Sequence, residues 1–152
     1  MHLYVHDFMS TALITVRPEA TLRQASKQLE EHRIRHLLVM EEGDLVGIVT
    51  DRDVRQALPA LPFVSDFAEM LLKMDQVKVR DIMSRELVAI SPDVGLEAAV
   101  DLFLARRISA LPVVERQRVL GILTVTDALR GLRLLLPVAP GGQAHVAVAS
   151  AG

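Results

Sequence analysis

Apolar and polar residues along the first half of the chain switch between the period of a strand and that of a helix. A short β-rich run precedes Thr21, which with Gln24 three residues later has the pattern of a helix capping box. The residues that share the apolar face of the following helix are Leu22, Ala25 and Leu29. The predicted elements are a strand at 13–16, this helix, strands at 37–40 and 45–49, and a helix at 54–58.

The second half of the chain shows the same order of elements. The apolar face of its first helix consists of Leu96, Ala99, Val100 and Phe103. The predicted elements are a strand at 87–90, this helix, strands at 111–114 and 119–123, and a helix at 128–136. The order in each half is therefore strand, helix, strand, strand, helix, which predicts an α+β fold.

A comparison of the chain with itself indicates a tandem duplication. A shift of 74 residues aligns Val5–Val54 with Val79–Ala128 without a gap, and 17 of these 50 positions are identical. Unrelated segments of ordinary composition would share about three. The predicted units are a first repeat at 3–58, a linker with a helix at 59–76, a second repeat at 77–136 and a flexible tail at 137–152.

Each repeat has a Gly-x-x-Thr-x-x-Asp segment where its hairpin ends and its last helix begins. The polar pairs are Thr50 with Asp53, and Thr124 with Asp127. One interpretation is helix capping, because Thr and Asp are preferred at helix starts. The other is ligand binding, because a carboxylate can accept both hydroxyls of a ribose, and open sheets commonly bind ligands beyond the carboxyl ends of their strands. The duplication strengthens the second interpretation.

The composition is globular, with 51% hydrophobic and 24% charged residues, no Trp and one Tyr, so the core must be aliphatic. The absence of Cys excludes disulfides and thiolate metal sites. A net charge of −2 without a basic stripe argues against nucleic acid binding. No apolar run approaches the roughly 18–20 residues that span a bilayer, and the first residues lack a signal-peptide pattern. We therefore expect a cytoplasmic protein that does not contact membranes.

The first helix of the second repeat is apolar almost all round. Besides its core face it carries Ala98, Leu102, Leu104 and Ala105, and leucines at 132–136 extend the surplus. A helix that is apolar on every side must be covered on every side. The sequence therefore predicts a homodimer. The alternative is that the linker helix, predicted at 65–74, covers the surplus within one chain.

The order and spacing of these motifs resemble a tandem pair of CBS domains, often called a Bateman module. The matching segments are Asp-x-Met-Ser at 7–10 and 81–84, Arg-Ile-x-x-Leu at 33–37 and 107–111, and the two Gly-x-x-Thr-x-x-Asp ends. The resemblance covers about residues 3–136. The Asp51-Arg52-Asp53 variant and the helical linker are also similar to stand-alone bacterial modules called acetoin-utilisation proteins. The resemblance implies two β-α-β-β-α repeats related by a pseudo-twofold axis.

The resemblance further implies two clefts between the repeats, which bind AMP, ADP, ATP or S-adenosylmethionine. One cleft would use Leu13, Ile14, His32, Arg33, Thr124, Thr126 and Asp127. The other would use Thr50, Asp53, Leu87, Val88, Arg106 and Arg107. Thr126 offers a second hydroxyl, so the Asp127 cleft is expected to bind more tightly. Arg52 stands at the matching position of the other cleft, where it would reach a phosphate or pair with Asp51.

Several residues allow other interpretations. The arginines of both clefts lie near helix ends, where cations also offset the helix dipole. His32 and His36 have a spacing that can hold zinc. Ser10 and Ser84 lie near acids, but no motif places a histidine to activate either hydroxyl. We therefore expect a ligand-sensing regulatory module that is not an enzyme and acts on an unidentified protein. The alternatives are a structural dimerisation module, a metal-binding or nucleic-acid-binding protein, or an enzyme of another type.

Overall fold

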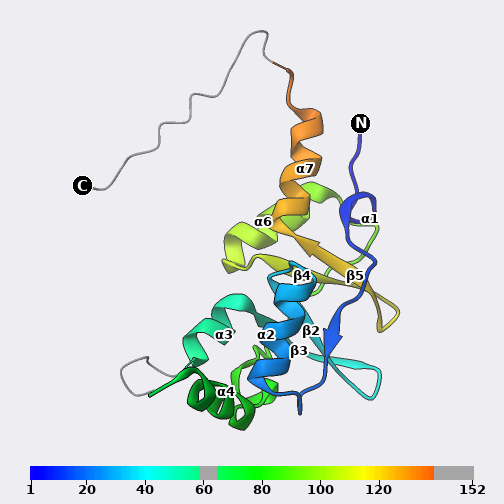
Figure 1. Ribbon diagram of the computed structural model, residues 1–152. Helices are drawn as coiled ribbons and strands as arrows, with labels where there is room; N and C mark the ends of the chain where they lie inside the picture. Colours follow the sequence, from blue (N-terminus) through cyan, green and yellow to red (C-terminus); the bar gives the residue numbers. More distant parts are fainter. Residues whose placement is uncertain (59–64, 139–152) are drawn as a thin grey trace, which may run out of the picture.

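The computed structural model describes residues 1–58 and 65–138 of the chain (Figure 1). One sheet has the strand order β1-β2-β3 and the other pairs β4 with β5. The elements of the first repeat and linker are α1 (Val5–Phe8), β1 (Thr15–Val16), α2 (Leu22–Glu31), β2 (His36–Glu41), β3 (Asp44–Thr50), α3 (Asp51–Ala57) and α4 (Phe67–Gln76). Those of the second repeat are α5 (Val79–Ile82), α6 (Leu96–Arg106), β4 (Ala110–Glu115), β5 (Arg118–Thr124) and α7 (Val125–Leu135). The predicted α+β fold with two matching repeats is confirmed.

The first long helix, α2, begins as its capping box predicts. The backbone N–H of Gln24 donates to Thr21 Oγ1 over 3.1 Å, and the N–H of Thr21 donates to Gln24 Oε1 over 2.9 Å. The predicted apolar face is buried, at Leu22, Ala25 and Leu29. Local sequence and tertiary packing therefore agree on the position of this helix.

The first strand of each repeat is shorter than predicted. In the first repeat, Thr15 and Val16 pair in parallel with β2. In the second, Ile90 pairs with β4 only through an isolated bridge to Val113. Pro112 explains the difference, because it occupies the position of Leu38 in β2 and has no N–H with which to extend the ladder. Its carbonyl is still used, since the N–H of Ile90 donates to Pro112 O over 3.0 Å.

The two hydrophobic cores exchange their short helices. Val5 of α1 is fully buried in the core of the second repeat, together with Leu96 of α6. Val79 of α5 is fully buried in the core of the first repeat, together with Leu22 of α2. Figure 1 shows α1, at the blue end of the chain, beside α7 at its orange end. Each core therefore contains a helix that the sequence assigns to the other repeat.

The exchanged segments also pair with the hairpins. Ser10 forms an isolated antiparallel bridge with Ile122, and Ser84 forms the equivalent bridge with Ile48. The segment at Ser10 approaches so closely that a Cβ on Gly121 would lie 2.3 Å from the Ser10 carbonyl oxygen. The glycine of each Gly-x-x-Thr-x-x-Asp segment therefore makes room for the backbone of the other repeat.

The linker helix α4 begins two residues later than predicted, because Asp66 is its N-cap and accepts a hydrogen bond from the N–H of Glu69. It packs against α2 and buries Met74 in the core of the first repeat. It leaves exposed leucines on α6, around α7 and at the C-cap of α7, whose combined surface we call the α6–α7 face: Leu104, Leu129, Leu134, Leu135 and Leu136. The alternative that the linker helix covers this surplus is therefore wrong.

Two predictions fall largely outside the described residues. These are the break at 59–62 between the repeats and the flexible tail at 137–152, of which the structure describes only Pro137 and Val138. Within the described parts of the chain, no helix combines the length and the apolar character that crossing a membrane requires.

Candidate ligand-binding clefts

The Asp127 cleft, of about 440 Å³, lies where the first repeat meets the end of β5 and the start of α7. It brings together six of the seven residues that the sequence assigns to it: Leu13, Ile14, Arg33, Thr124, Thr126 and Asp127. The seventh, His32, is not part of the lining. It is the exposed C-cap of α2.

The Asp53 cleft is larger, at about 720 Å³, and lies on the other side of the same junction. The predicted residues that line it are Thr50, Asp53, Leu87, Val88 and Arg107. Arg106 is not part of the lining, and its Nη1 lies 3.9 Å from Glu86 Oε1 at the surface. Asp51 pairs with Arg55 over 3.2 Å, and Arg52 is one of the residues that line this cleft.

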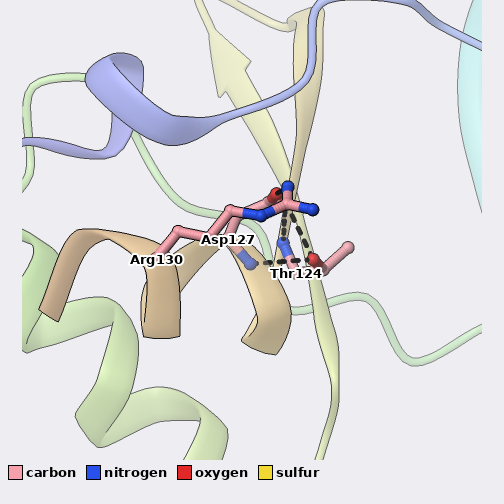
Figure 2. Close-up of polar contacts among 3 residues, drawn as sticks. All are labelled: Thr124, Asp127 and Arg130. Atoms are coloured by element: carbon pink, nitrogen blue, oxygen red, sulfur yellow. Dashed lines mark hydrogen bonds and ion pairs between the residues drawn. The ribbon is translucent and has the colours of Figure 1, made fainter. Parts of the chain in front are cut away.

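The Thr and Asp of each cleft form a capping box. In α7 the N–H of Thr124 donates to Asp127 Oδ2 over 2.9 Å, and the N–H of Asp127 donates to Thr124 Oγ1 over 3.3 Å (Figure 2). In α3 the corresponding distances between Thr50 and Asp53 are 2.8 and 3.1 Å. The last helices therefore begin three residues before the predicted starts, and the capping interpretation is correct as far as it goes.

Capping leaves one oxygen of Asp127 for another partner. Oδ2 takes the Thr124 contacts, including a 2.8 Å hydrogen bond from its hydroxyl, whereas Oδ1 lies 3.2 Å from Arg130 Nη1 (Figure 2). The Asp127 side chain is 14% exposed but that of Arg130 is 73% exposed. Such a surface pair contributes only about 0–1 kcal/mol. Capping and ligand binding by Asp127 thus do not require the same oxygen.

Arg33 and Arg107 share an uncommon backbone conformation. Their φ angles are +51° and +53°, in the left-handed region that favours glycine, and each follows the first long helix of its repeat. Arg33 lies two residues beyond the end of α2, so its charge sits outside the last helical turn. A non-glycine residue in this conformation costs of order 1–2 kcal/mol. Both repeats keep this strain where the arginine lines a cleft.

His36, at the start of β2, lines both clefts. Its Nε2 lies 2.8 Å from Ser109 Oγ, which connects the two repeats. Burial lowers the pKa of His36 below the usual 6.5, a shift that Asp51 and Asp53 oppose and that Arg35 reinforces. The structure offers no further zinc ligands beside His36, since the described residues contain no group of three or more His, Asp or Glu side chains able to hold a metal.

Two arginines of the Asp127 cleft were missed in the sequence. Arg130 lies one helical turn after Asp127, a spacing that places both on one face and could have identified it. Arg35 precedes β2, and no motif indicated which way it faces. Together with Arg33 they give this cleft three arginines against the single carboxylate of Asp127. The Asp53 cleft is closer to balance, with four arginines and three carboxylates: Arg35, Arg52, Arg55 and Arg107 with Asp51, Asp53 and Glu86.

The CBS domain family matches the chain twice, at residues 5–60 and 79–134. These two segments contain both capping boxes and the arginines that follow the first long helices. The chain therefore belongs to the CBS domain family and contains a tandem pair of these domains.

Relatives of similar size support this assignment. The CBS domain-containing protein YhcV of Bacillus subtilis is 32% identical over 123 residues, 81% of each chain. The CBS domain pair of protein MJ0100, solved in complex with 5′-methylthioadenosine and S-adenosyl-L-methionine, has a TM-score of 0.74 at 28% identity and covers 90% of this chain and 100% of that one. A Vibrio cholerae protein provisionally named as the acetoin utilization protein AcuB has a TM-score of 0.71 at 26% identity, covering 89% and 94%. The resemblance predicted from the sequence is confirmed.

Larger relatives match in only one part. The chain spans 21–24% of the length of several enzymes, among them homoserine O-acetyltransferase and inosine-5′-monophosphate dehydrogenase of archaea. Two relatives that match along most of their own length, from Bacillus subtilis and Dictyostelium discoideum, are named as CBS domain-containing proteins.

Proposed function

We propose that this CBS pair is a regulatory module that binds an adenine nucleotide in the Asp127 cleft and passes the bound state to a partner protein. The observation that carries the proposal is the composition of this cleft. It has an apolar wall at Leu13 and Ile14, the carboxylate of Asp127, and an excess of arginine. Each of these features matches one part of a nucleotide.

The three parts of the ligand would occupy different sides of the cleft. The flat base needs apolar surface, which Leu13 and Ile14 supply. The ribose hydroxyls would donate to Asp127, with Thr126 as a second polar group. The phosphate would bind Arg33, because a guanidinium fork can donate two parallel hydrogen bonds to phosphate oxygens.

The charge of the cleft favours a nucleotide over S-adenosylmethionine, whose sulfonium would meet three arginines. The bound state of MJ0100 still makes S-adenosylmethionine and methylthioadenosine the second candidates. A thermal-shift panel of AMP, ADP, ATP, adenosine, methylthioadenosine and S-adenosylmethionine separates them. A ligand at a hundredfold excess over its Kd stabilises the folded state by about 2.7 kcal/mol. The melting temperature should then rise by roughly 5–10 °C. Unchanged melting with every ligand at millimolar concentration would exclude the proposal.

The role is one of binding rather than catalysis. Its support is that enzymes match this chain over about a quarter of their length or less, whereas small CBS domain-containing proteins match over most of it. Incubation with ATP or S-adenosylmethionine should therefore release no product beyond the uncatalysed rate.

A homodimer is the second part of the proposal. The α6–α7 face exposes five leucines, with Leu104 at 73% and Leu134 at 63% exposure. Where exposed apolar side chains gather into a large patch, they mark an interaction site. We infer that a second copy of the chain covers this face.

A further inference from the structure

The two clefts share a wall. Four residues line both of them: Arg35, His36, Thr124 and Thr126. The first two come from the first repeat at the start of β2, and the others come from the second repeat at the start of α7. The 2.8 Å contact between His36 Nε2 and Ser109 Oγ fastens the repeats together at this wall.

The two repeats differ in sequence at this wall. A shift of 74 residues aligns Arg35 with Ser109 and His36 with Ala110. Ser109 and Ala110 line only the Asp53 cleft. Among the residues that the structure describes, Arg35 is thus the one arginine that lines both clefts. The second repeat supplies a hydroxyl where the first supplies a cation.

We propose that Arg35 is a single phosphate-binding cation shared by the two clefts, so that an anionic ligand in one weakens the binding of a second in the other. The inference rests on the proposed function and adds a rule for how the clefts influence each other. Arg33 and Arg107 each line one cleft, so both clefts keep a cation of their own. The second ligand therefore still binds, with lower affinity.

The physical reason is the geometry of guanidinium. A fork that donates two parallel hydrogen bonds to one phosphate is held in one orientation and largely neutralised. A second phosphate, in the other cleft, then finds an Arg35 side chain that is already neutralised. The negative charge of the first phosphate also repels it across the wall. His36 does not provide a second cation at this wall, because burial lowers the pKa of its imidazole and keeps it neutral near pH 7. Coupling between two sites is typically about 5–150-fold in affinity.

Two matched substitutions isolate the clefts. Ala12 and Glu86 are equivalent positions of the two repeats, and both are exposed. Ala12 lines only the Asp127 cleft, and Glu86 lines only the Asp53 cleft. Ala12→Trp should fill the first, and Glu86→Trp should fill the second, without altering either capping box. Each variant then reports the dissociation constant of one remaining cleft.

Isothermal titration of the full chain with AMP gives the coupling directly. For independent clefts, the product of the two wild-type dissociation constants equals the product of the two single-cleft constants. Under the proposal, the wild-type product is larger by about 5–150-fold. Titration with adenosine, which has no phosphate, should give equal products.

Two further variants assign the effect to Arg35. When Arg35→Gln is introduced into the wild type and into both tryptophan variants, the product of the two wild-type dissociation constants should equal the product of the two single-cleft constants. Arg17→Gln, which removes an exposed arginine outside both linings, should leave these two products different. Ser109→Arg supplies the second cation and should reduce the coupling.

The outcomes are distinct. Equal products for wild type with AMP, or a difference that persists in Arg35→Gln, overturn the shared-cation inference and leave the proposed function standing. A wild type that binds one AMP supports the inference if both tryptophan variants still bind one, and overturns it if only one variant does. Absence of AMP binding in all three proteins overturns the proposed function and the inference with it.

Discussion

At the scale of single residues, Asp127 combines two interactions that are often treated as alternatives. One carboxylate oxygen holds the start of α7 through Thr124, and the other lies 3.2 Å from Nη1 of the exposed Arg130. A helix cap is thus also a fixed hydrogen-bond acceptor at the edge of a cleft. The same side chain should therefore contribute to both folding and binding.

Asp127→Ala should lower the stability of the unliganded protein by about 1 kcal/mol, because the capping box is lost. It should also remove most of the rise in melting temperature that AMP produces, because the ribose loses its acceptor. Thr21→Ala is the matched control, since it breaks the capping box of α2 outside both clefts. The control should lose stability and keep the full AMP effect. An Asp127→Ala protein with an undiminished AMP shift would reduce this residue to a cap.

Arg33→Gly should change stability and binding in opposite directions. Glycine adopts the φ of +51° without steric cost, so the unliganded melting temperature should rise, by the equivalent of about 1 kcal/mol. Affinity for AMP should fall while affinity for adenosine changes little, because only AMP carries a phosphate. Calorimetric titration with both ligands measures the difference. Equal losses for AMP and adenosine would contradict a phosphate-binding role.

His36 should make stability depend on pH. Burial lowers the pKa of its imidazole in the folded state, whereas the unfolded chain takes up a proton near the usual value of 6.5. The unfolded state therefore binds more protons below that pH, and the free energy of unfolding falls as the pH drops through 6.5. Urea unfolding at about pH 7.5 and about pH 5.5 should show a larger loss for wild type than for His36→Gln. Identical losses would show that His36 does not set this dependence.

At the scale of elements, the hairpins are held by backbone contacts between the repeats, and the two glycines there are not equivalent. A Cβ on Gly121 would meet the Ser10 carbonyl oxygen at 2.3 Å, whereas one on Gly47 would meet the Met83 sulfur at 2.6 Å and the Ser84 carbonyl oxygen at 3.0 Å. A methionine side chain can move aside more easily than a paired backbone carbonyl.

Gly121→Ala should therefore destabilise the protein by about 1–3 kcal/mol, as overpacking usually does, and Gly47→Ala should destabilise it less. Chemical denaturation of both variants tests this order. A reversed order would mean that the segment at Ser10 adjusts more readily than the one at Ser84.

Elements whose periodicity is local could be predicted from the sequence. The capping box at Thr21 and the apolar face of α2 are correct because they depend on neighbouring residues. The missing strand partner at Ile90 depends on Pro112 in another strand, which periodicity along the chain does not show. The exchanged helices α1 and α5 have four residues each, too few for a periodic signal.

The residues that line the clefts could likewise be predicted in part. The resemblance to a known family indicated seven residues for the Asp127 cleft, and six of them line it in the structure. It did not indicate Arg35 and His36, because those positions differ between the two repeats and only the folded chain shows that they lie on a shared wall. Sequence repetition therefore reveals what the clefts have in common, and the structure reveals where they differ.

At the scale of the whole molecule, the α6–α7 face predicts self-association. Light scattering at tens of micromolar should return the mass of a dimer. Leu135→Glu, at a position that is 42% exposed, should shift the mass toward the monomer without unfolding the chain. Leu72→Glu is the matched control, since this leucine is 63% exposed on α4, which packs on the first repeat. A monomer mass for the wild type would remove the dimer from the proposal.

The exchange of α1 and α5 between the cores also sets an order for folding during synthesis. Val5 leaves the ribosome well before its core neighbours Leu96 and Ala128, which follow it in the chain. The first repeat likewise waits for Val79 to fill its core. A nascent chain that ends at Leu120 should therefore leave residues 1–10 open to protease, whereas the released protein should protect them. The helix α1 therefore docks only after the second repeat, whose core it fills, has been translated.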